Sequence, residues 1–392
     1  KTMKWKFYSL AFVAGMSILT ACSSDDNNDN DGNGGNGNGN EIENGTILKG
    51  TITSDVTLAA GNTYKLSGEY IVEEGATLHI EEGVKIIAVY DDIADYILVK
   101  QGGKINAVGT PDKPIVMTSE KEEPGAWGGI HICGRAHTNA EGGKGSSEIG
   151  GAVYGGNDDA DNSGTLQYIR LEYTGFAFDE EHEANGISFY GVGNGTIVDH
   201  CQAYKGSDDG FEFFGGSVNV SNLVAVSCSD DSFDWTEGWN GKGTNLVAYQ
   251  EAESTLGYDC DCLMECDNNG SNNAATPVAH PVLKNLILVG NGGSKQGIRL
   301  RAGTEVEIDN AKVCGKGQPL TVETALTENA LKNGTSKLTN ITLTSELSCK
   351  EGIYTHADFI AVTSNKVDAN LSYSSFEDIR KECSWMNGSW VK

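Results

Sequence analysis

Residues 186–239 read GISFYGVGNGTIVDHCQAYKGSDDGFEFFGGSVNVSNLVAVSCSDDSFDWTEGW, and this stretch repeats itself. At an offset of 22, the later copy places Asp230, Asp231, Phe233, Asp234 and Trp235 on Asp208, Asp209, Phe211, Glu212 and Phe213. A looser match sets Gly186 against Gly210, an offset of 24. A period in the low twenties with short apolar alternation is typical of a β-solenoid, in which each repeat is one coil. The rest of the chain is therefore predicted to form the coils and caps around this stretch.

Aromatic and acidic side chains alternate in the repeat, so one set must face the interior of the stack. Phe211 and Phe213 lie on one side of a strand, and Glu212 lies on the other. Burying an unpaired carboxylate costs several kcal/mol, whereas a buried Phe stabilises the fold by about 2 kcal/mol. The sequence therefore predicts aromatic side chains inside and carboxylates outside.

Stacked coils would arrange these acids in ladders. Neighbouring strands lie about 4.8 Å apart, a distance at which carboxylates repel one another. A cation, a raised pKa, a nearby Lys such as Lys205, or backbone N–H groups at the coil corners could offset the repulsion. If a cation does so, calcium is the predicted cofactor, with Glu212 and Asp234 as ligands. The predicted ligand-binding residues are these acids, one further acid and two aromatic residues expected at the surface: Asp208, Asp209, Glu212, Asp230, Asp231, Asp234, Glu237, Trp239 and Tyr190.

Residues 134–164, rich in Gly, Asn, Asp and Ser, are predicted to be a loop insertion. Asp159, Asp161 and Ser163 partly resemble the start of an EF-hand loop, but the terminal Glu of that motif is absent. Two interpretations stay open: a solvated loop, or a calcium site with Asp159 and Asp161 as ligands.

The remaining segments follow from composition and periodicity. The predicted boundaries are a signal peptide (1–21), a flexible acidic tether (22–45), a β-helix domain (46–349) with an amino-terminal cap at 46–70, and a C-terminal cap (350–392). A second insertion is predicted at 251–281. Thr321–Asn333 is the best helical candidate, because its pattern ends before Gly334.

Several segments resemble known β-helix proteins. Residues 99–130 contain GGKINAVGTPDKPIVMTS and WGGI, and they resemble the first full coils of bacterial right-handed parallel β-helix proteins of the pectate-lyase-like superfold. Residues 161–175 (DNSGTLQYIRLEYTG) and 207–216 (SDDGFEFFGG) resemble one family of exported, often lipid-anchored proteins of Bacteroides-like and marine bacteria. The resemblance spans about residues 70–315. It implies an all-β, right-handed parallel β-helix with loop insertions and a short mixed C-terminal cap.

The amino-terminal residues indicate export. Three Lys residues precede an apolar run that is too short to span a membrane, which is typical of a signal peptide. ILTAC, ending at Cys22, resembles a bacterial lipobox, so Cys22 is the expected lipidation site. The acids after Cys22 resemble a surface-export signal. We therefore expect an outer-membrane lipoprotein exposed at the cell surface, with a periplasm-facing anchor as the alternative.

The formal charge of −27 narrows the range of partners. It disfavours nucleic acid, and it disfavours anionic glycans unless a metal bridges them. Of ten Cys, Cys22 is assigned to lipid, which leaves an odd number and so at least one unpaired thiol. Buried thiols or disulfides are favoured over zinc, because no CxxC motif and no His at ligand spacing occur near Cys260, Cys262 and Cys266.

Three functions remain open. The favoured one is a noncatalytic glycan-binding or adhesive module, since carboxylates accept hydroxyl hydrogen bonds and sugars stack on aromatic rings. The second is a polysaccharide-degrading enzyme: a glycosidase that uses paired carboxylates, or a uronic-acid lyase with Arg299 or Arg301 as base. Both Arg residues could instead pair with Glu305 or Glu307. The third is a structural subunit of an outer-membrane complex. Whether catalysis occurs stays uncertain and is less favoured, because a Gly-His-Gly element of β-helix pectin hydrolases is missing.

Overall fold

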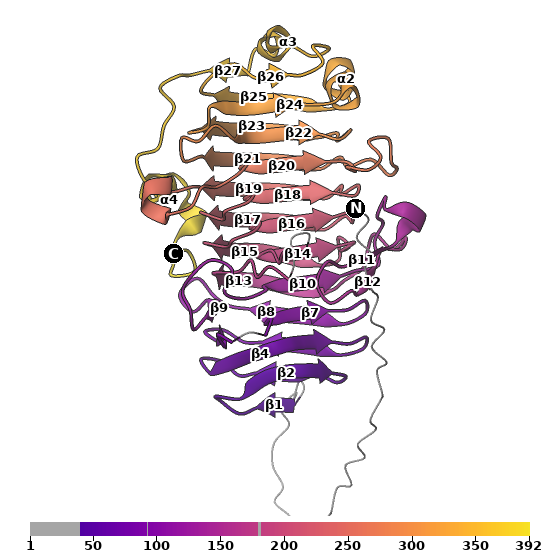
Figure 1. The fold of residues 1–392 in the computed structure, drawn as a ribbon, viewed down its shortest axis with the longest axis vertical. Coiled ribbons are helices and arrows are strands. Elements are labelled where there is room, and N and C mark those ends of the chain that lie inside the picture. Colours follow the sequence, from indigo (N-terminus) through magenta and orange to yellow (C-terminus); the bar gives the residue numbers. More distant parts are fainter. Residues whose placement is uncertain (1–39, 92, 179–181) are drawn as a thin grey trace, which may run out of the picture. The chain divides into compact units, whose positions relative to one another are not determined.

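The computed structural model describes residues 40–91, 93–178 and 182–392. These residues form a right-handed parallel β-helix whose coils stack along one axis, as predicted (Figure 1). Among the named strands of these residues, only β11 (Gly145–Ser146) and β12 (Val153–Tyr154) pair antiparallel. The predicted signal peptide, Cys22 and the predicted tether up to residue 39 lie outside the described residues.

The strands form three columns, and successive coils add segments to each. The first column contains β1 (Asn40–Ile42), β3 (Val56–Leu58), β5 (Thr77–Ile80), β8 (Lys104–Val108) and the first halves of the long strands β13 (Gly164–Glu172), β15 (Ile197–Tyr204), β17 (Asn219–Val226), β19 (Lys242–Tyr249), β21 (Val282–Val289), β23 (Glu307–Cys314) and β25 (Lys337–Leu343). The second column contains the first halves of β2 (Ile47–Ile52) and β4 (Thr63–Val72), then β6 (Lys85–Ala88), β9 (Ile115–Ser119), the second halves of the long strands and β27 (Lys366–Val367). The third column contains the second halves of β2 and β4, then β7 (Tyr96–Val99), β10 (Ile130–Cys133), β14 (Ile187–Tyr190), β16 (Phe211–Phe214), β18 (Phe233–Thr236), β20 (Met264–Asp267), β22 (Gln296–Arg301), β24 (Gln318–Val322) and β26 (Ser348–Cys349).

The amino-terminal end of the stack differs from the prediction. Residues 46–70, expected to be a cap, already form coil strands, because Leu48 and Leu66 point inward in register with each other. Even Asn40–Ile42, placed in the tether from sequence, pairs with β3. The β-helix therefore begins before residue 46.

The interior of the third column confirms the predicted register and orientation. Phe211 pairs with Phe233, and Phe213 pairs with Trp235, so the offset of 22 separates adjacent coils. All four side chains are at most 2% exposed, and the rings of Phe211 and Phe233 stack with centroids 5.6 Å apart. Burial of each ring stabilises the fold by about 2 kcal/mol. The aromatic residues therefore lie inside and leave Glu212 and Asp234 outside.

An asparagine ladder marks the bend between the first and second columns. Asn222, Asn245, Asn285 and Asn310 all have positive φ, between 55° and 63°. The side-chain amide of each one from Asn245 onward donates to the Asn of the preceding coil, at 2.8–3.0 Å. Asn tolerates this left-handed backbone conformation. The ladder therefore fixes the bend in each coil and keeps successive coils aligned.

The first insertion lies where the sequence predicts it. Residues 134–164 carry the short helix η1 (Glu141–Gly143) and the β11–β12 hairpin. Ile149 and Tyr154 join Leu98 and Tyr190 in an apolar cluster on the outer face of the third column. The insertion therefore covers the early part of that face and leaves the part around β16 to β20 open.

The second predicted insertion, 251–281, is wrong in part. Its middle is β20, an ordinary third-column strand with Met264 and Cys266 in the core. Only the segments on either side leave the coil, and the first of them carries α1 (Glu253–Leu256). The run of cysteines in the sequence concealed this strand.

The predicted C-terminal cap is correct only in its first part. The helices α2 (Ala325–Asn333) and α3 (His356–Ala361) lie at the end of the stack, and α2 ends before Gly334 as predicted, although Gln318–Val322 belongs to β24 (Figure 1). Residues 371–392, here called the C-terminal strap, instead return along the side of the stack. The strap contains α4 (Phe376–Glu382) and the short helix η2 (Ser384–Met386).

The strap covers an apolar surface of the second column. Val224, Val247 and Ile287 point outward from β17, β19 and β21 and pack with Ile379 and Trp390. An exposed apolar surface of this kind needs a cover. The predicted cap therefore also serves as a side wall.

The cysteines are thiols, and the helices are short. All nine Cys of the described residues are free, and all except Cys349 are buried: Cys133, Cys201, Cys228, Cys260, Cys262, Cys266, Cys314, Cys349 and Cys383. Of the two alternatives left open, buried thiols are thus the one found. No helix in the described part of the chain has the length and apolar character to cross a bilayer.

Candidate functional site

One row of outward-facing residues runs across the third column. Ser188, Glu212, Asp234, Glu265 and Arg299 are register partners on successive strands from β14 to β22. Neighbouring parallel strands lie about 4.8 Å apart. Three carboxylates therefore stand side by side before an Arg follows.

A second set of acids lies at the corner that precedes each strand. Asp209 Oδ1 accepts the backbone N–H of Asp231 at 2.8 Å, and Asp231 Oδ1 accepts that of Cys262 at 2.7 Å. The sequence predicted backbone bonds as one way to hold the corner acids, and this is what the second Asp of each doublet does. The bond runs to the next coil, so one oxygen of each carboxylate supports the stacking.

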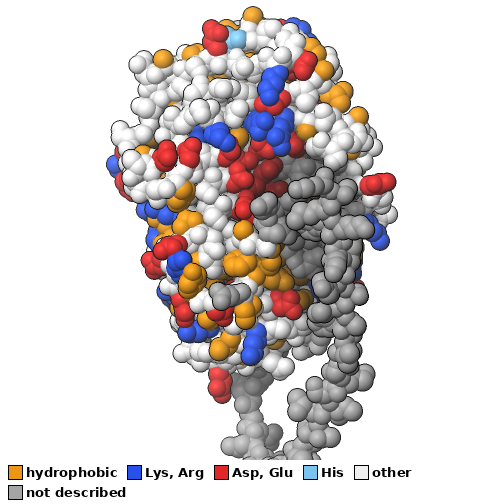
Figure 2. All heavy atoms as spheres, viewed as in Figure 1, with side chains coloured by type: hydrophobic (Ala, Val, Ile, Leu, Met, Phe, Trp, Pro, Cys, Tyr) orange, Lys and Arg blue, Asp and Glu red, His pale blue; other side chains and the backbone are white. Residues whose placement is uncertain are grey.

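The row and the corner acids surround a cleft of about 430 Å³. It is lined by Glu148, Glu183, Asn185, Asp208, Asp209, Glu212, Asp230, Asp231, Asp234, Asp261, Glu265 and Arg299. Ten of these side chains are carboxylates, and Arg299 is the one basic residue among them. Figure 2 shows the acidic side chains gathered on one face, with Lys and Arg side chains next to them. The cleft therefore carries a strong negative charge.

Two loops complete the walls of the cleft. Glu148 comes from the 134–164 insertion and accepts a hydrogen bond from Tyr190 Oη at 3.3 Å. Glu183 comes from the loop that follows β13, where it forms an antiparallel bridge with Ala177. Both acids lie outside the repeat, and Glu148 is far from it in sequence, so the fold brings Glu148 to the cleft.

Burial and mutual repulsion raise the pKa of the cleft acids. Burial, and then the Asp230 carboxylate, raise the pKa of Asp208 to about 7. Burial, followed by the Asp261 carboxylate, raises the pKa of Asp230 to about 6. The same causes hold the pKa values of Glu212 and Asp234 well above their usual range. Positive charge inside the cleft would therefore relieve a large electrostatic cost.

Two buried oxygen atoms of the cleft have no hydrogen-bond partner among the described residues. Asn185 is 1% exposed, and its Nδ2 donates to Glu212 Oε2 at 2.6 Å, but its Oδ1 is buried without a partner. Asp234 Oδ1 is buried without a partner as well. Oxygens of Asp209, Glu212 and Asp234 all come within 4.8 Å of one another. A set made only of oxygen donors suits a hard cation such as Ca²⁺.

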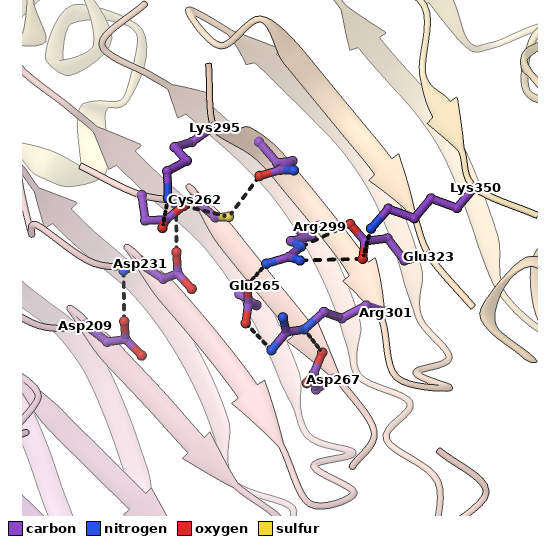
Figure 3. Close-up of polar contacts among 12 residues, drawn as sticks. Asp209, Asp231, Cys262, Glu265, Asp267, Lys295, Arg299, Arg301, Glu323 and Lys350 are labelled. Atoms are coloured by element: carbon purple, nitrogen blue, oxygen red, sulfur yellow. Dashed lines mark hydrogen bonds and ion pairs between the residues drawn. The ribbon is translucent and has the colours of Figure 1, made fainter. Parts of the chain in front are cut away.

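The next coils along the row carry paired charges. Arg299 binds Glu265 at 2.8 Å and Glu323 at 3.1 Å (Figure 3). Arg301 binds Glu265 and Asp267, and Lys350 binds Glu323 at 2.6 Å. The predicted partners of the two Arg residues, Glu305 and Glu307, are wrong, since both of these acids contact His280. The basic residues therefore close one end of the cleft.

The sequence matches one family of known proteins over most of its length. The sequence model of the family described as pectate-lyase-like beta helix domain matches residues 50–391. The chain belongs to this family. No curated protein and no solved structure matches it. The pectate-lyase-like β-helix confirms the superfold that the sequence resembles, and it is consistent with a protein that handles carbohydrate.

This pectate-lyase-like β-helix does not place the predicted aromatic residues in its cleft. Trp239 and Tyr190, expected at the surface to stack on sugar, are each 1% exposed. Trp239 stacks on Phe213 in the core, and Tyr190 stacks on Phe214 under the insertion. Coil stacking and the covering loop bury them, so the prediction of exposed aromatic ligands is wrong.

Other predicted residues serve the fold around the cleft. Glu237 accepts hydrogen bonds from Thr138 and Tyr154, each at 2.7 Å, and so fastens the insertion to β18. Lys205 does not balance the acid ladder, because it binds Glu251 at 2.8 Å.

Asp159 and Asp161, the second predicted calcium site, do not line the cleft. Asp159 Oδ1 binds His137 Nδ1 at 2.6 Å, and Asp161 Oδ2 accepts the backbone N–H of Arg135. Neither belongs to the groups of closely spaced ligand atoms found among the described residues. Both acids therefore hold the insertion loop in place.

The sequence contained one overlooked signal for the cleft. Asp261 and Glu265 continue the repeat into a third coil, because Asp261-Cys262 follows the pattern of Asp230-Asp231 and Glu265 pairs with Asp234. Glu148 and Glu183 carry no such signal, because they come from the loop insertion and from the segment before the repeat. Asn185 takes the place of Asp209 in the looser match of offset 24, but it is not an acid.

Proposed function

We propose that the cleft binds calcium and, through calcium, a carbohydrate, so that the protein acts as a noncatalytic glycan-binding β-helix. The observation that carries this proposal is the group of carboxylate oxygens from Asp209, Glu212 and Asp234, which lie within 4.8 Å of one another, together with Asp234 Oδ1, which is buried without a hydrogen-bond partner. Ca²⁺ takes about six to eight oxygen ligands, and this floor offers only oxygens. Zn²⁺, in contrast, favours nitrogen and sulfur ligands.

The negative charge of the cleft favours a ligand that is bound through the cation. Ten carboxylates repel an anionic sugar, and neither Trp239 nor Tyr190 is available to stack on a neutral one. A sugar that offers carboxylate or vicinal hydroxyl oxygens could complete the coordination shell of the ion. The family description names pectate lyases, whose name refers to a polymer of uronic acid, and this supports acidic polysaccharide as the first class to test.

The charged state of the basic residues favours binding over elimination. A lyase base must lose its proton near neutral pH. Hydrogen bonds and charge from Glu323 and Glu265 outweigh burial and raise the pKa of Arg299 above its ordinary value. Asp267 and Glu265 do the same for Arg301. The predicted lyase bases therefore act as fixed cations.

A glycosidase is the second candidate, because the cleft holds acids whose pKa is raised toward neutral pH. Burial raises the pKa of both Asp208 and Glu148 to about 7. A glycosidase needs a protonated acid next to an ionised carboxylate. This arrangement was not foreseen from sequence, where the acids lacked an evident proton-donor environment.

We further propose that the domain is held at the outer membrane by lipid on Cys22 and faces the cell surface. The lipobox-like residues and the acidic segment behind them support this location. A role of the protein as a subunit of an envelope complex is compatible with this location. Replacing Cys22 by Ser should release the protein into the soluble fraction, and whole-cell protease sensitivity of the unmodified protein should report surface exposure.

Affinity electrophoresis tests the main proposal. The domain comprising residues 40–392 would be run through gels that contain polygalacturonate, alginate or mannan, with calcium or with EDTA. We expect retardation in at least one gel with calcium, its loss with EDTA, and no new reducing ends or unsaturated products. Glu212→Gln with Asp234→Asn should abolish the retardation, whereas Glu305→Gln, outside the cleft, should not. Retardation that survives EDTA, or none in any gel, would overturn the proposal, and released products would favour the glycosidase.

A further inference from the structure

A second groove lies on the same corner of the coils as the acidic cleft. Its volume is about 310 Å³, and its lining includes Tyr90, Asp91, Lys121, Glu123 and Phe176. The turn at residues 124–126 supplies its floor. This groove combines aromatic surface with a polar rim, which is the usual make-up of a small-ligand site.

Tyr90 presents an aromatic ring to solvent. Its side chain is 55% exposed. Lys121 Nζ lies 4.5 Å from the ring centroid and donates to Tyr90 Oη at 2.9 Å, and it also binds Glu123 at 2.9 Å. These contacts hold the ring in place from one side. The ring is therefore exposed and makes polar contacts with Lys121.

The groove belongs to a larger exposed apolar patch. Ile93 is 57% exposed and Phe178 is 40% exposed, and the ring of Phe178 lies 5.2 Å from that of Phe176. Figure 2 shows hydrophobic side chains gathered on the same face as the acidic patch and next to it. Contiguous exposed apolar surface marks an interaction site more often than chance.

Hydrogen bonds connect this groove to the cleft along the stack. Gly125 N–H donates to Thr174 O at 2.8 Å, and Ser207 Oγ donates to Gly175 O at 2.5 Å, directly before Asp208. The Tyr90 corner follows β6, and the strands β9, β13 and β15 stack on it in order. The Tyr90 and Asp208 corners are therefore three coils apart, roughly 15 Å along the axis.

One loop touches both sites. Phe176 lines the groove and Glu183 lines the cleft, and an antiparallel bridge between Ala177 and Glu183 joins the two arms of their loop. The described residues of this loop therefore contribute to both the groove and the cleft.

We propose that this groove is a second carbohydrate subsite, which stacks the apolar face of a sugar ring on Tyr90 and Phe176 while the acidic cleft holds the same polysaccharide chain through calcium. This inference rests on the proposed function of the cleft. A sugar fits the groove better than a protein segment, because the groove is small and acids and a Lys lie around its rings. The aromatic stacking predicted for Trp239 and Tyr190 is thus supplied by other residues.

Binding of short and long oligogalacturonates to the domain in calcium, measured by isothermal titration calorimetry, tests the subsite. Tyr90→Ala should weaken binding of the long oligomers about tenfold, since a stacked aromatic contact is worth about 1 kcal/mol or slightly more. It should leave the short oligomers and the calcium affinity unchanged. Tyr90→Phe keeps the ring and its contact with Lys121 and should restore the affinity, although it removes the hydrogen bond from Lys121 Nζ. Tyr90 is exposed, so neither variant should disturb folding, and the melting temperature would check this.

The outcomes separate the two proposals. If calcium binds and the unmodified domain binds long oligogalacturonates, but Tyr90→Ala binds them equally well, the subsite is wrong and the cleft proposal stands. If the unmodified domain binds no oligomer of either length, the proposed subsite for uronic-acid polymers is wrong. Affinity electrophoresis then decides whether the cleft binds another polysaccharide. If Tyr90→Ala instead abolishes association with a protein from the envelope, the patch is a protein-docking surface and the subsite is wrong.

Discussion

Two neighbouring parts of one row of side chains handle charge in opposite ways. At β16 and β18 the row presents Glu212 and Asp234, which have no basic side chain in hydrogen-bond contact in the described structure. At β22 and β24 it presents Arg299, which binds acids of the strands on both sides. The backbone geometry is the same in both parts, so the difference lies only in the side chains.

This contrast shows which charges the fold itself balances. The paired part is neutralised within the chain, and it would persist without any ligand. In the acidic part, the carboxylates either take up protons or repel one another unless a cation enters the cleft. The stack therefore tolerates an electrostatic cost in this acidic part, which is typical of a functional site.

The largest expected effect of a single substitution comes from breaking the paired part. Arg299→Ala leaves Glu265 and Glu323, which are 15% and 9% exposed, without their shared cation. Arg301 still binds Glu265 and Lys350 still binds Glu323, so neither acid is left wholly unpaired, and we expect a loss of about 2 kcal/mol in the free energy of unfolding. Urea denaturation measures it. Added calcium should recover part of the loss by binding Glu265. A loss in the free energy of unfolding no larger than that expected for an exposed ion pair would contradict the contrast between the paired and the acidic part of the row.

Removing charge from the acidic part should have the opposite sign. Glu212→Gln with Asp234→Asn relieves repulsion, so the variant should be more stable than the unmodified domain in EDTA. The unmodified domain should gain about 2.7 kcal/mol at a calcium concentration a hundred times its dissociation constant. The variant should lose this gain, as thermal melting with and without calcium would show. If the unmodified domain melts at the same temperature with and without calcium, the cleft does not bind this cation.

The two parts should also differ in their response to pH. In EDTA, the folded-state pKa values of about 7 for Asp208 and about 6 for Asp230 lie above those of the unfolded chain. Such groups stabilise the fold at low pH, and this contribution is lost as pH rises through 6 to 7. The EDTA form should therefore melt a few degrees higher near pH 5 than near pH 8. Calcium should reverse the trend, because it competes with these protons, and Asp208→Asn should flatten the EDTA profile.

The smallest effect is expected at an exposed pair on the same stack. Lys337 binds Glu307 at 2.9 Å, with side chains 56% and 36% exposed. Solvent screens such a pair, so Lys337→Ala should change the free energy of unfolding by less than about 0.5 kcal/mol. The same urea experiment serves as the control for Arg299→Ala. A large effect here would mean that paired charges stabilise this stack wherever they lie.

The sequence predicted those parts of the fold that the repeat determines. Phe211 and Phe233 had to face inward because burial of carboxylates costs more, and the offset of 22 therefore became the coil length. The strap was not predicted, because Val224 and Val247 look like ordinary strand residues until the column exposes them. Strand β20 was missed because its cysteines suggested a separate insertion.

Only part of the candidate site could be predicted from the sequence. The acids of the repeat all line the cleft, since register alone places them together. Glu148 and Glu183 could not be predicted, because loops of unrelated sequence carry them there. Trp239 was misplaced because alternation does not reveal that a residue after the strand turns back over Phe213.

The strap also changes how the molecule can come apart. In a simple solenoid each coil touches only its neighbours, so the ends can fray one coil at a time. Here Arg170 on β13 binds the backbone of Ser389, and Lys392 binds Glu172, so the last residues of the chain are fastened to coils in the first half of the domain. Loss of the final coils therefore does not release the strap, and loss of the strap bares several coils at once. The protein should consequently unfold between β13 and its carboxyl end as a single cooperative block.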